Sequence, residues 1–100
     1  MTLDEGAPMH FDFELFVAGD APNSARALSN LRSLCELRVP NRYTIVVIDV
    51  FEDPGRALAE NILLTPTVLR ISPGPERRIV GTLSHAGEVA DALGLEPEAA

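Results

Sequence analysis

The chain has 100 residues, 46% of them apolar, and it carries fifteen acidic side chains against eight basic ones, for a formal net charge of −7. This length fits one small domain and leaves no room for a second, catalytic domain. The apolar content excludes intrinsic disorder. The negative charge disfavours nucleic-acid binding, because it repels phosphate backbones.

The cysteine count and the N-terminal residues bear on the cellular compartment. Cys35 is the single cysteine, so the chain is not a secreted scaffold held by internal disulfides. The first ten residues are acidic where a signal peptide is basic, and no apolar run is long enough to span a bilayer. We therefore expect a cytoplasmic protein that binds neither a membrane nor nucleic acid.

The domain is expected to span residues 10–95, between a flexible arm at 1–9 and an acidic tail at 96–100. Its first segment, residues 10–17, alternates apolar and polar side chains, which predicts a strand with one solvent-exposed face. Phe16 interrupts the polar side of this pattern. We expect a helix to cover Phe16, the alternative being an interface.

A turn then leads into a helix that ends at about Arg38, because leucines recur at helical spacing. Three residues near its start are candidates for the N-cap, and the sequence does not choose among Asp20, Asn23 and Ser24. Cys35 lies in the apolar stripe of this helix. We therefore expect a packed thiol rather than a reactive one.

Residues 43–51 are rich in β-branched side chains and nearly continuously apolar, which predicts a central strand buried on both faces. Asp53 is the expected N-cap of a short helix that has Pro54 at its first position. The inner face of this helix is expected to carry three apolar side chains, Ala57, Leu58 and Ile62.

The C-terminal half is expected to begin with a hairpin of two strands, residues 67–71 and 77–80. Pro73 and Gly74 suit the two central positions of a type II turn, which requires a positive φ at the second position. Gly81 is expected to end the second strand.

A last helix is expected after the hairpin, with Ser84 as its N-cap and Gly94 as its stop. Its buried face is expected to carry four apolar side chains, Ala86, Val89, Ala90 and Leu93.

This order of elements (βαβαββα) predicts an α/β, thioredoxin-like single domain. The helical crossover makes the first two strands parallel, whereas the hairpin adds an antiparallel pair, and helices cover both faces of the sheet. Pro66 stands at the entry to the third strand, where thioredoxin-like folds place a proline, often after a cis peptide bond.

The residues that thiol catalysis needs are missing from the expected places. A thiol oxidoreductase of this fold needs a Cys-x-x-Cys pair where the first helix begins. Residues 23–26 contain no cysteine, and Cys35 lies about three helical turns further along. Ser24 is expected to cap the helix rather than to act as a catalytic hydroxyl.

Motifs for cofactors and metals are missing as well. His10 and His85 form no Cys-His cluster with metal-binding spacing, and neither a P-loop nor a Rossmann glycine pattern is present. Asp49, near the end of the second strand, is expected to be structural. We therefore expect no enzyme activity, no cofactor and no metal.

Three segments resemble one known family. They are LFVAGDAPNSARALSNL at residues 15–31, VIDVFEDP at 47–54 and ILLTPTVLRISPGPERRIVGTLS at 62–84. In this order they are similar to KaiB, a family of the bacterial circadian clock, over about residues 11–94. The resemblance implies a non-enzymatic regulator that docks on the ATPase and kinase KaiC, in circadian rhythm or in a stress response. In full clocks, KaiB proteins also sequester KaiA.

The resemblance also implies two folds. KaiB proteins switch between a tetrameric ground-state fold with a rearranged C-terminal half and a thioredoxin-like monomer that binds KaiC. Pro66, Pro73 and Pro75 match the prolines that change isomer in this switch. Gly74 and Glu76 depart from the family's proline and apolar residue, and we expect the C-terminal half to prefer the strand–turn–strand–helix order. A homo-oligomer, dimer or tetramer, is compatible with the resemblance.

Three arginines, Arg26, Arg77 and Arg78, match family positions that affect partner binding, and the alternative is a solvated edge. Adjacent strand residues point to opposite faces. One of Arg77 and Arg78 is therefore expected against the helical layer, and the other outward as an anchor for a partner's carboxylate. Two alternative functions are a thioredoxin-like redox protein that uses Cys35 alone and a sensor domain like that of a clock histidine kinase.

Overall fold

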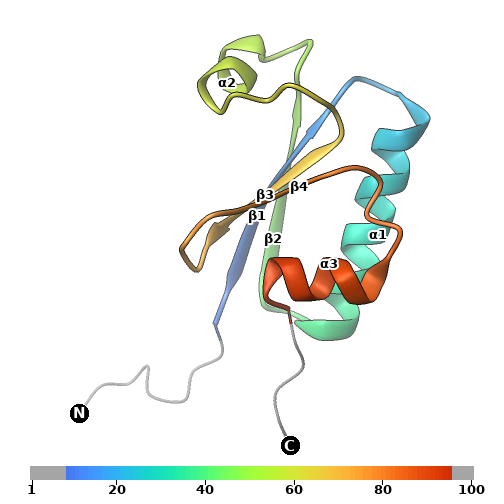
Figure 1. Cartoon of the computed structure of the whole chain (residues 1–100), viewed down its shortest axis with the longest axis vertical. Coiled ribbons are helices and arrows are strands. Elements are labelled where there is room, and N and C mark those ends of the chain that lie inside the picture. The colour runs from blue at the N-terminus through green and yellow to red at the C-terminus, as the bar shows by residue number, and fades with distance from the viewer. Residues whose placement is uncertain (1–8, 96–100) are drawn as a thin grey trace, which may run out of the picture.

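The computed structural model describes residues 9–95, which form one four-stranded sheet with helices on both faces (Figure 1). The expected arm, apart from Met9, and the expected acidic tail lie outside the described residues. The elements in chain order are β1 (Phe11–Val17), α1 (Pro22–Arg38), β2 (Tyr43–Asp49), α2 (Pro54–Ala59), β3 (Thr67–Ser72), β4 (Arg77–Val80) and α3 (Ala86–Leu93).

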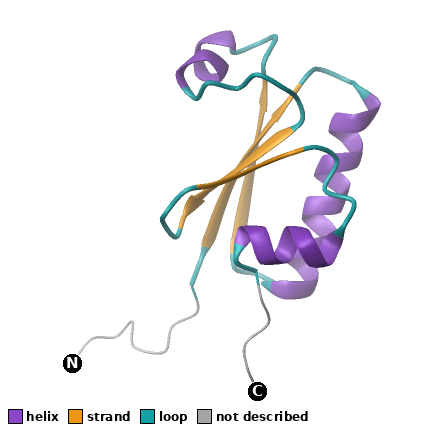
Figure 2. Cartoon of the chain, in the orientation of Figure 1, coloured by secondary structure: helices purple, strands orange, loops and turns teal. Residues whose placement is uncertain are grey.

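The strands follow the order β2-β1-β3-β4 across the sheet. β1 is parallel to β2, as the helical crossover predicted, and β3 is antiparallel to both β1 and β4. Helices α1 and α3 lie together against one face, whereas α2 lies on the other face near one end of the sheet (Figure 2). This is the thioredoxin-like arrangement that the sequence predicted.

The prediction that the second strand is central was wrong. β2 is an edge strand, and Val46 keeps 49% of its surface exposed. Its apolar residues face both helical layers, since Ile45 packs on the core under α1 and α3 and Ile48 on the core under α2. At the edge of the sheet neither layer covers the strand fully. A continuous apolar run therefore does not distinguish an edge strand from a central one.

The core has two parts, one on each face of the sheet. The larger part lies between the sheet and helices α1 and α3, and it contains Cys35. The smaller part contains Phe16, Ile48, Ala57 and Leu69, and α2 contributes Ala57 to it. Phe16 is fully buried there, which confirms that a helix covers it.

The start of α1 differs from the prediction. Ala21 is the N-cap, and none of Asp20, Asn23 and Ser24 caps the helix through its side chain. The Ser24 hydroxyl instead accepts a hydrogen bond from the backbone N–H of Ala18 at 3.2 Å. Pro22 in the first turn lacks an N–H, so the helix has fewer free donors for a side chain to satisfy.

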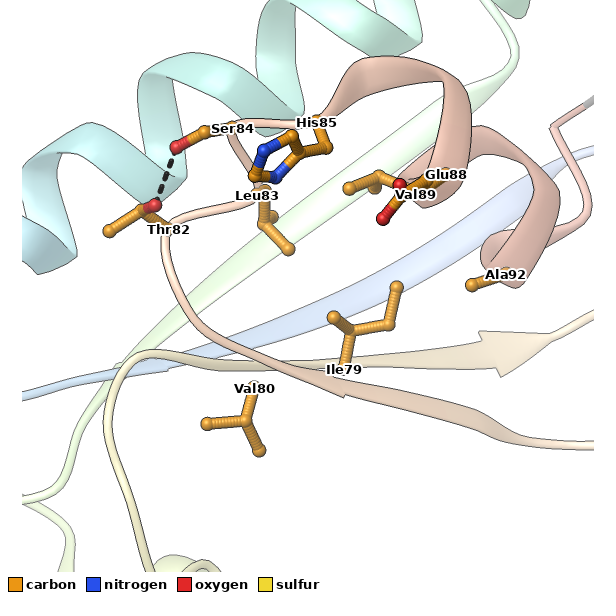
Figure 3. A pocket seen from close by; sticks show the side chains of 9 residues that line it. All are labelled: Ile79, Val80, Thr82, Leu83, Ser84, His85, Glu88, Val89 and Ala92. Carbon is orange, nitrogen blue, oxygen red and sulfur yellow. Dashed lines mark hydrogen bonds between the residues drawn. The ribbon is translucent and has the colours of Figure 1, made fainter.

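The ends of α2 and α3 confirm two predictions and contradict one. Asp53 caps α2 by accepting from the Arg56 N–H at 3.2 Å, and Gly94 ends α3 with a φ of +72°. His85, and not Ser84, is the N-cap of α3, because the Ser84 hydroxyl pairs with Thr82 at 2.6 Å (Figure 3).

The predicted buried faces of these two helices are only partly correct. α2 has six residues, and of its predicted inner face Leu58 is exposed whereas Ala57 is buried. In α3, Val89, Ala90 and Leu93 are buried as predicted, but Ala86 is exposed. Ala86 is the first residue of α3 and Leu58 the second-last residue of α2, so both exposed side chains lie near a helix end.

The turn between β3 and β4 is not the predicted type II turn. Gly74 is not among the glycines with positive φ, which that turn requires at its second central position. Cis peptide bonds precede Pro66, Pro73 and Pro75. Gly81, with a φ of +122°, follows the last residue of β4, as predicted. No helix within residues 9–95 has the length and apolar character needed to cross a membrane.

Candidate protein-binding surface

The segment around α2 exposes large apolar side chains, which we call the α2 patch. Leu58 and Leu63 each keep 82% of their surface exposed. The other members, also largely exposed, are Phe51 and Leu64. The same segment of the chain carries four carboxylates, which belong to Asp49, Glu52, Asp53 and Glu60. Large apolar side chains left exposed together in one segment are typical of a protein-binding surface.

The β2 strand leads directly into the α2 patch. One side of β2 pairs with β1, and the other side is the open edge of the sheet. Val46 and Val47 are both exposed along this edge. An open strand edge offers unpaired N–H and C=O groups to a partner. The edge of β2 and the α2 patch are therefore consecutive along the chain.

Asp49 is structural, as the sequence predicted, and it shapes the join between β2 and the α2 patch. Its Oδ1 atom accepts hydrogen bonds from the backbone N–H of Gly19 at 3.2 Å and of Phe51 at 2.9 Å. Gly19 has a φ of +53°, and a Cβ at this position would lie 3.6 Å from the Phe51 ring. One carboxylate thus ties the β1–α1 loop to the start of the patch.

An ion pair fixes α2 to the centre of the sheet. The Arg56 guanidinium donates from Nη2 to Oε2 of Glu14 on β1 at 2.5 Å. The hydrogen bond and the negative charge of Glu14 raise the pKa of Arg56. Ala57 is the only buried residue of α2, so few apolar contacts hold this helix against the sheet. The ion pair with Glu14 therefore matters more for the position of α2 than it would for a helix with a broad apolar face.

Arg77 and Arg78 lie on opposite faces of β4, as predicted, and each donates to backbone carbonyls at the end of a helix. Arg77 donates from Nη1 to the carbonyl of Ala92 at the end of α3 at 3.0 Å. Arg78 donates to the carbonyls of Glu60 at 2.8 Å and Asn61 at 3.2 Å, just past α2. Both arginines keep exposed side chains, so a role of either one as an anchor for a partner stays a prediction.

Arg26 is exposed on α1, and within residues 9–95 it makes no hydrogen bond or ion pair. No such contact joins it to Arg77 or Arg78. The structure therefore leaves Arg26 available to solvent, and its role in partner binding stays a prediction.

Arg70 is a structural residue that the sequence analysis missed. It lies on β3 with 5% of its surface exposed, and its guanidinium donates to the carbonyls of Leu93 at 2.7 Å and Pro75 at 2.9 Å. Burial lowers the pKa of Arg70, and the charge of Arg77 adds to this effect. The signal in the sequence is a single charged residue within an apolar strand.

A groove of about 330 Å³ runs between β4, the following connector and α3. Ile79, Leu83 and Val89 point toward one another inside it, whereas His85 and Glu88 lie beside them (Figure 3). Leu83 has a φ of +63°, which is rare for a bulky side chain.

In the part of the chain that the structure describes, no three His, Cys, Asp or Glu side chains group as metal ligands.

Cys35 is placed as a core residue. Its side chain is fully buried in α1, and burial together with the charge of Glu36 raises the pKa of the thiol to about 12. The reactive thiolate is therefore not available near neutral pH. At the start of α1, where a dithiol would stand, Ser24 holds the preceding loop instead.

A comparison with known protein families places nearly all of the described domain in one family. A family described as KaiB domain matches residues 14–95. The chain belongs to the KaiB family. Among its relatives is the circadian clock oscillator protein KaiB of Prochlorococcus marinus, which is 46% identical over 82 residues, covering 82% of this chain and 69% of the relative. KaiB of Synechococcus elongatus is 43% identical, with coverage of 82% and 80%.

Solved structures confirm the thioredoxin-like fold. The N-terminal domain of SasA from Synechococcus elongatus matches with a TM-score of 0.69 and 18% identity, covering 93% of this chain and 91% of that domain. Chloroplastic thioredoxin z matches with a TM-score of 0.69 and 24% identity, covering 85% and 76%. Of the two folds implied for KaiB, the structure has the thioredoxin-like one, with β3, β4 and α3 in the predicted order.

Proposed function

We propose that this KaiB-family chain is a non-enzymatic regulator that docks on a KaiC-type ATPase, in circadian rhythm or in a stress response. The α2 patch carries this proposal, because Leu58 and Leu63 are largely exposed and belong to a segment that also carries several carboxylates. The family membership and the clock proteins among the relatives support the choice of partner.

The chemistry of the patch defines a fitting partner surface. Burying one exposed leucine fully contributes roughly 1.5–3 kcal/mol, so two or three leucines contribute substantially to the affinity of a complex. The carboxylates of this segment and the net charge of −7 favour a partner with basic side chains around an apolar pocket. The open edge of β2 offers backbone groups beside this contact.

Other parts of the proposal rest on the family resemblance. Pro66, Pro73 and Pro75 are the proposed switch prolines, and Arg26 is a proposed partner contact. KaiA and a histidine kinase are proposed as further partners where the host has them.

Size-exclusion chromatography of the full chain with the host's KaiC proteins under ATP tests the docking. We expect a complex with the native chain and a large loss of it with Leu63→Asp. The matched control is Leu37→Asp, since Leu37 is similarly exposed but lies on α1, over the other face of the sheet. No complex at tens of micromolar with any of these KaiC proteins would overturn the proposal, as would equal losses in both variants.

An insulin-reduction assay tests the alternative redox function. We expect no reduction above the rate of the Cys35→Ala variant, because the thiol is buried and its pKa is raised to about 12. Catalysis that depends on Cys35 would favour the redox function over the regulatory one.

A further inference from the structure

We propose that Arg70 is a clasp that couples the proline turn of the β3–β4 hairpin to the C-terminal end of α3. The guanidinium donates from Nη2 to the carbonyl of Pro75 and from Nη1 to the carbonyl of Leu93. One rigid, planar group thus holds two segments that are 18 residues apart in the chain. The hairpin tip and α3 therefore move together.

The position of Arg70 in the sheet makes it suitable for this role. Arg70 lies on β3 between its register partners Phe13 on β1 and Arg77 on β4. All three residues are on the face that carries α3, where Arg77 binds the neighbouring carbonyl of Ala92. Two guanidinium groups thus satisfy consecutive carbonyls at the end of α3, which have no partner within the helix.

Charge explains why an arginine is needed at this buried position. Among residues 9–95 no carboxylate forms an ion pair with Arg70, and its neighbour Arg77 is also positive. The carbonyls at the C-terminal end of α3 carry the negative end of the helix dipole and take the place of a counter-ion. A buried charge held only by the carbonyls of Leu93 and Pro75 depends on their staying in place, so the contact stabilises one position of the helix end.

Gly94 supplies an independent observation for the clasp. A Cβ built on Gly94 would lie 2.5 Å from Nη1 of Arg70, so the guanidinium would have to shift to admit a side chain there. The φ of +72° at Gly94 already favours glycine. Both the backbone conformation and the nearby Arg70 guanidinium therefore favour glycine at this position.

Hydrogen exchange on the full chain tests the coupling. We expect Arg70→Met to speed exchange at the amides of Gly94 and Leu95 and in β4 by about tenfold or more, with β1 amides changing less. Arg70→Lys should give an intermediate increase, because one ammonium group lacks the planar fork that reaches both carbonyls. Arg26→Met is the control, since Arg26 is exposed and makes no hydrogen bond or ion pair among residues 9–95.

A double-substitution cycle tests the same contact where Arg70→Met fails to fold. Gly94→Ala should lower the Tm of the native chain more than that of the Arg70→Lys chain. The ammonium group of the lysine is smaller than the guanidinium and can move away from the new Cβ. Equal Tm losses in the two backgrounds would overturn the clasp. So would unchanged exchange at Gly94, Leu95 and β4 in a folded Arg70→Met variant.

Discussion

Arg77 and Arg78 are neighbours on β4, yet they bind the C-terminal ends of two different helices on opposite faces of the sheet. Arg77 reaches the carbonyl of Ala92 in α3, whereas Arg78 reaches those of Glu60 and Asn61 after α2. A strand of four residues thus anchors both helical layers. The positive side chains also complement the negative ends of the helix dipoles, which lie at these carbonyls.

Replacing either arginine by methionine is expected to lower stability. Each variant loses hydrogen bonds from a charged donor, worth about 0.5–1 kcal/mol at these exposed positions, and the Tm should fall by about 2–6 °C. Arg78→Met should in addition weaken docking on KaiC, because it loosens the end of α2 beside the patch. Circular dichroism melts give the Tm, and Arg26→Met should leave it unchanged. An unaltered Tm in both variants would show that the pair is only a solvated edge.

Two substitutions of Asp49 should distinguish its role as a hydrogen-bond acceptor from the effect of its negative charge. Asp49→Ala leaves the N–H groups of Gly19 and Phe51 without their acceptor, and we expect a loss of about 1–2 kcal/mol in the free energy of unfolding. Asp49→Asn keeps an oxygen in place and should cost less than half as much. Urea titrations measure both values, and equal losses would contradict a hydrogen-bonding role.

The buried thiol of Cys35 is expected to make the protein less stable at alkaline pH. Burial raises the pKa of the folded thiol from 9.0 to about 12, so above pH 9 the unfolded chain releases a proton that the folded chain retains. The free energy of unfolding should therefore decrease by up to about 1.4 kcal/mol per pH unit between pH 9 and 12. Below pH 9 both states are protonated and the effect vanishes.

The Cys35→Ala variant is the control for this dependence. It creates a small cavity and should be less stable at pH 7, but its stability should fall less steeply above pH 9. Urea titrations from pH 8 to pH 10.5 compare the two slopes. Parallel slopes would mean that the native thiol ionises as readily in the folded chain as in the unfolded one.

The order of the helices and strands was predictable from the sequence, but the extent to which each of them is buried was not. The helical leucine spacing and the Asp53 cap correctly predicted α1 and α2. Apolar side chains on both faces of β2 indicated a central strand, yet the two helical layers leave its edge open. Burial at an edge depends on what crosses over it, which is a property of tertiary packing and not of local pattern.

The contacts of the arginines were the part least accessible from the sequence. Strand alternation correctly put Arg77 and Arg78 on opposite faces, but it carried no information on which helix ends lie there. Arg70 was overlooked because its partners are backbone carbonyls of Pro75 and Leu93, which any residue type can provide. Only the register of β3 against β4 and the end point of α3 bring these groups together.

Phe16 links the stability of the sheet to the placement of the α2 patch. It is fully buried on β1, and its small cluster with Ile48, Ala57 and Leu69 is the apolar support of α2. Phe16→Leu should cost about 1–1.5 kcal/mol through incomplete filling of this site. Because α2 has little other apolar contact, the same substitution should weaken docking on KaiC more than its effect on global stability explains.

Phe13→Leu is the matched comparison for Phe16→Leu. Phe13 is buried on the same strand but belongs to the core under α1 and α3. The two variants should lose similar free energies of unfolding in urea, while only Phe16→Leu speeds hydrogen exchange at the Glu60 and Ile62 amides, which bond back to α2. Equal exchange at these amides in both variants would mean that Phe16 supports the sheet in general and not α2 in particular.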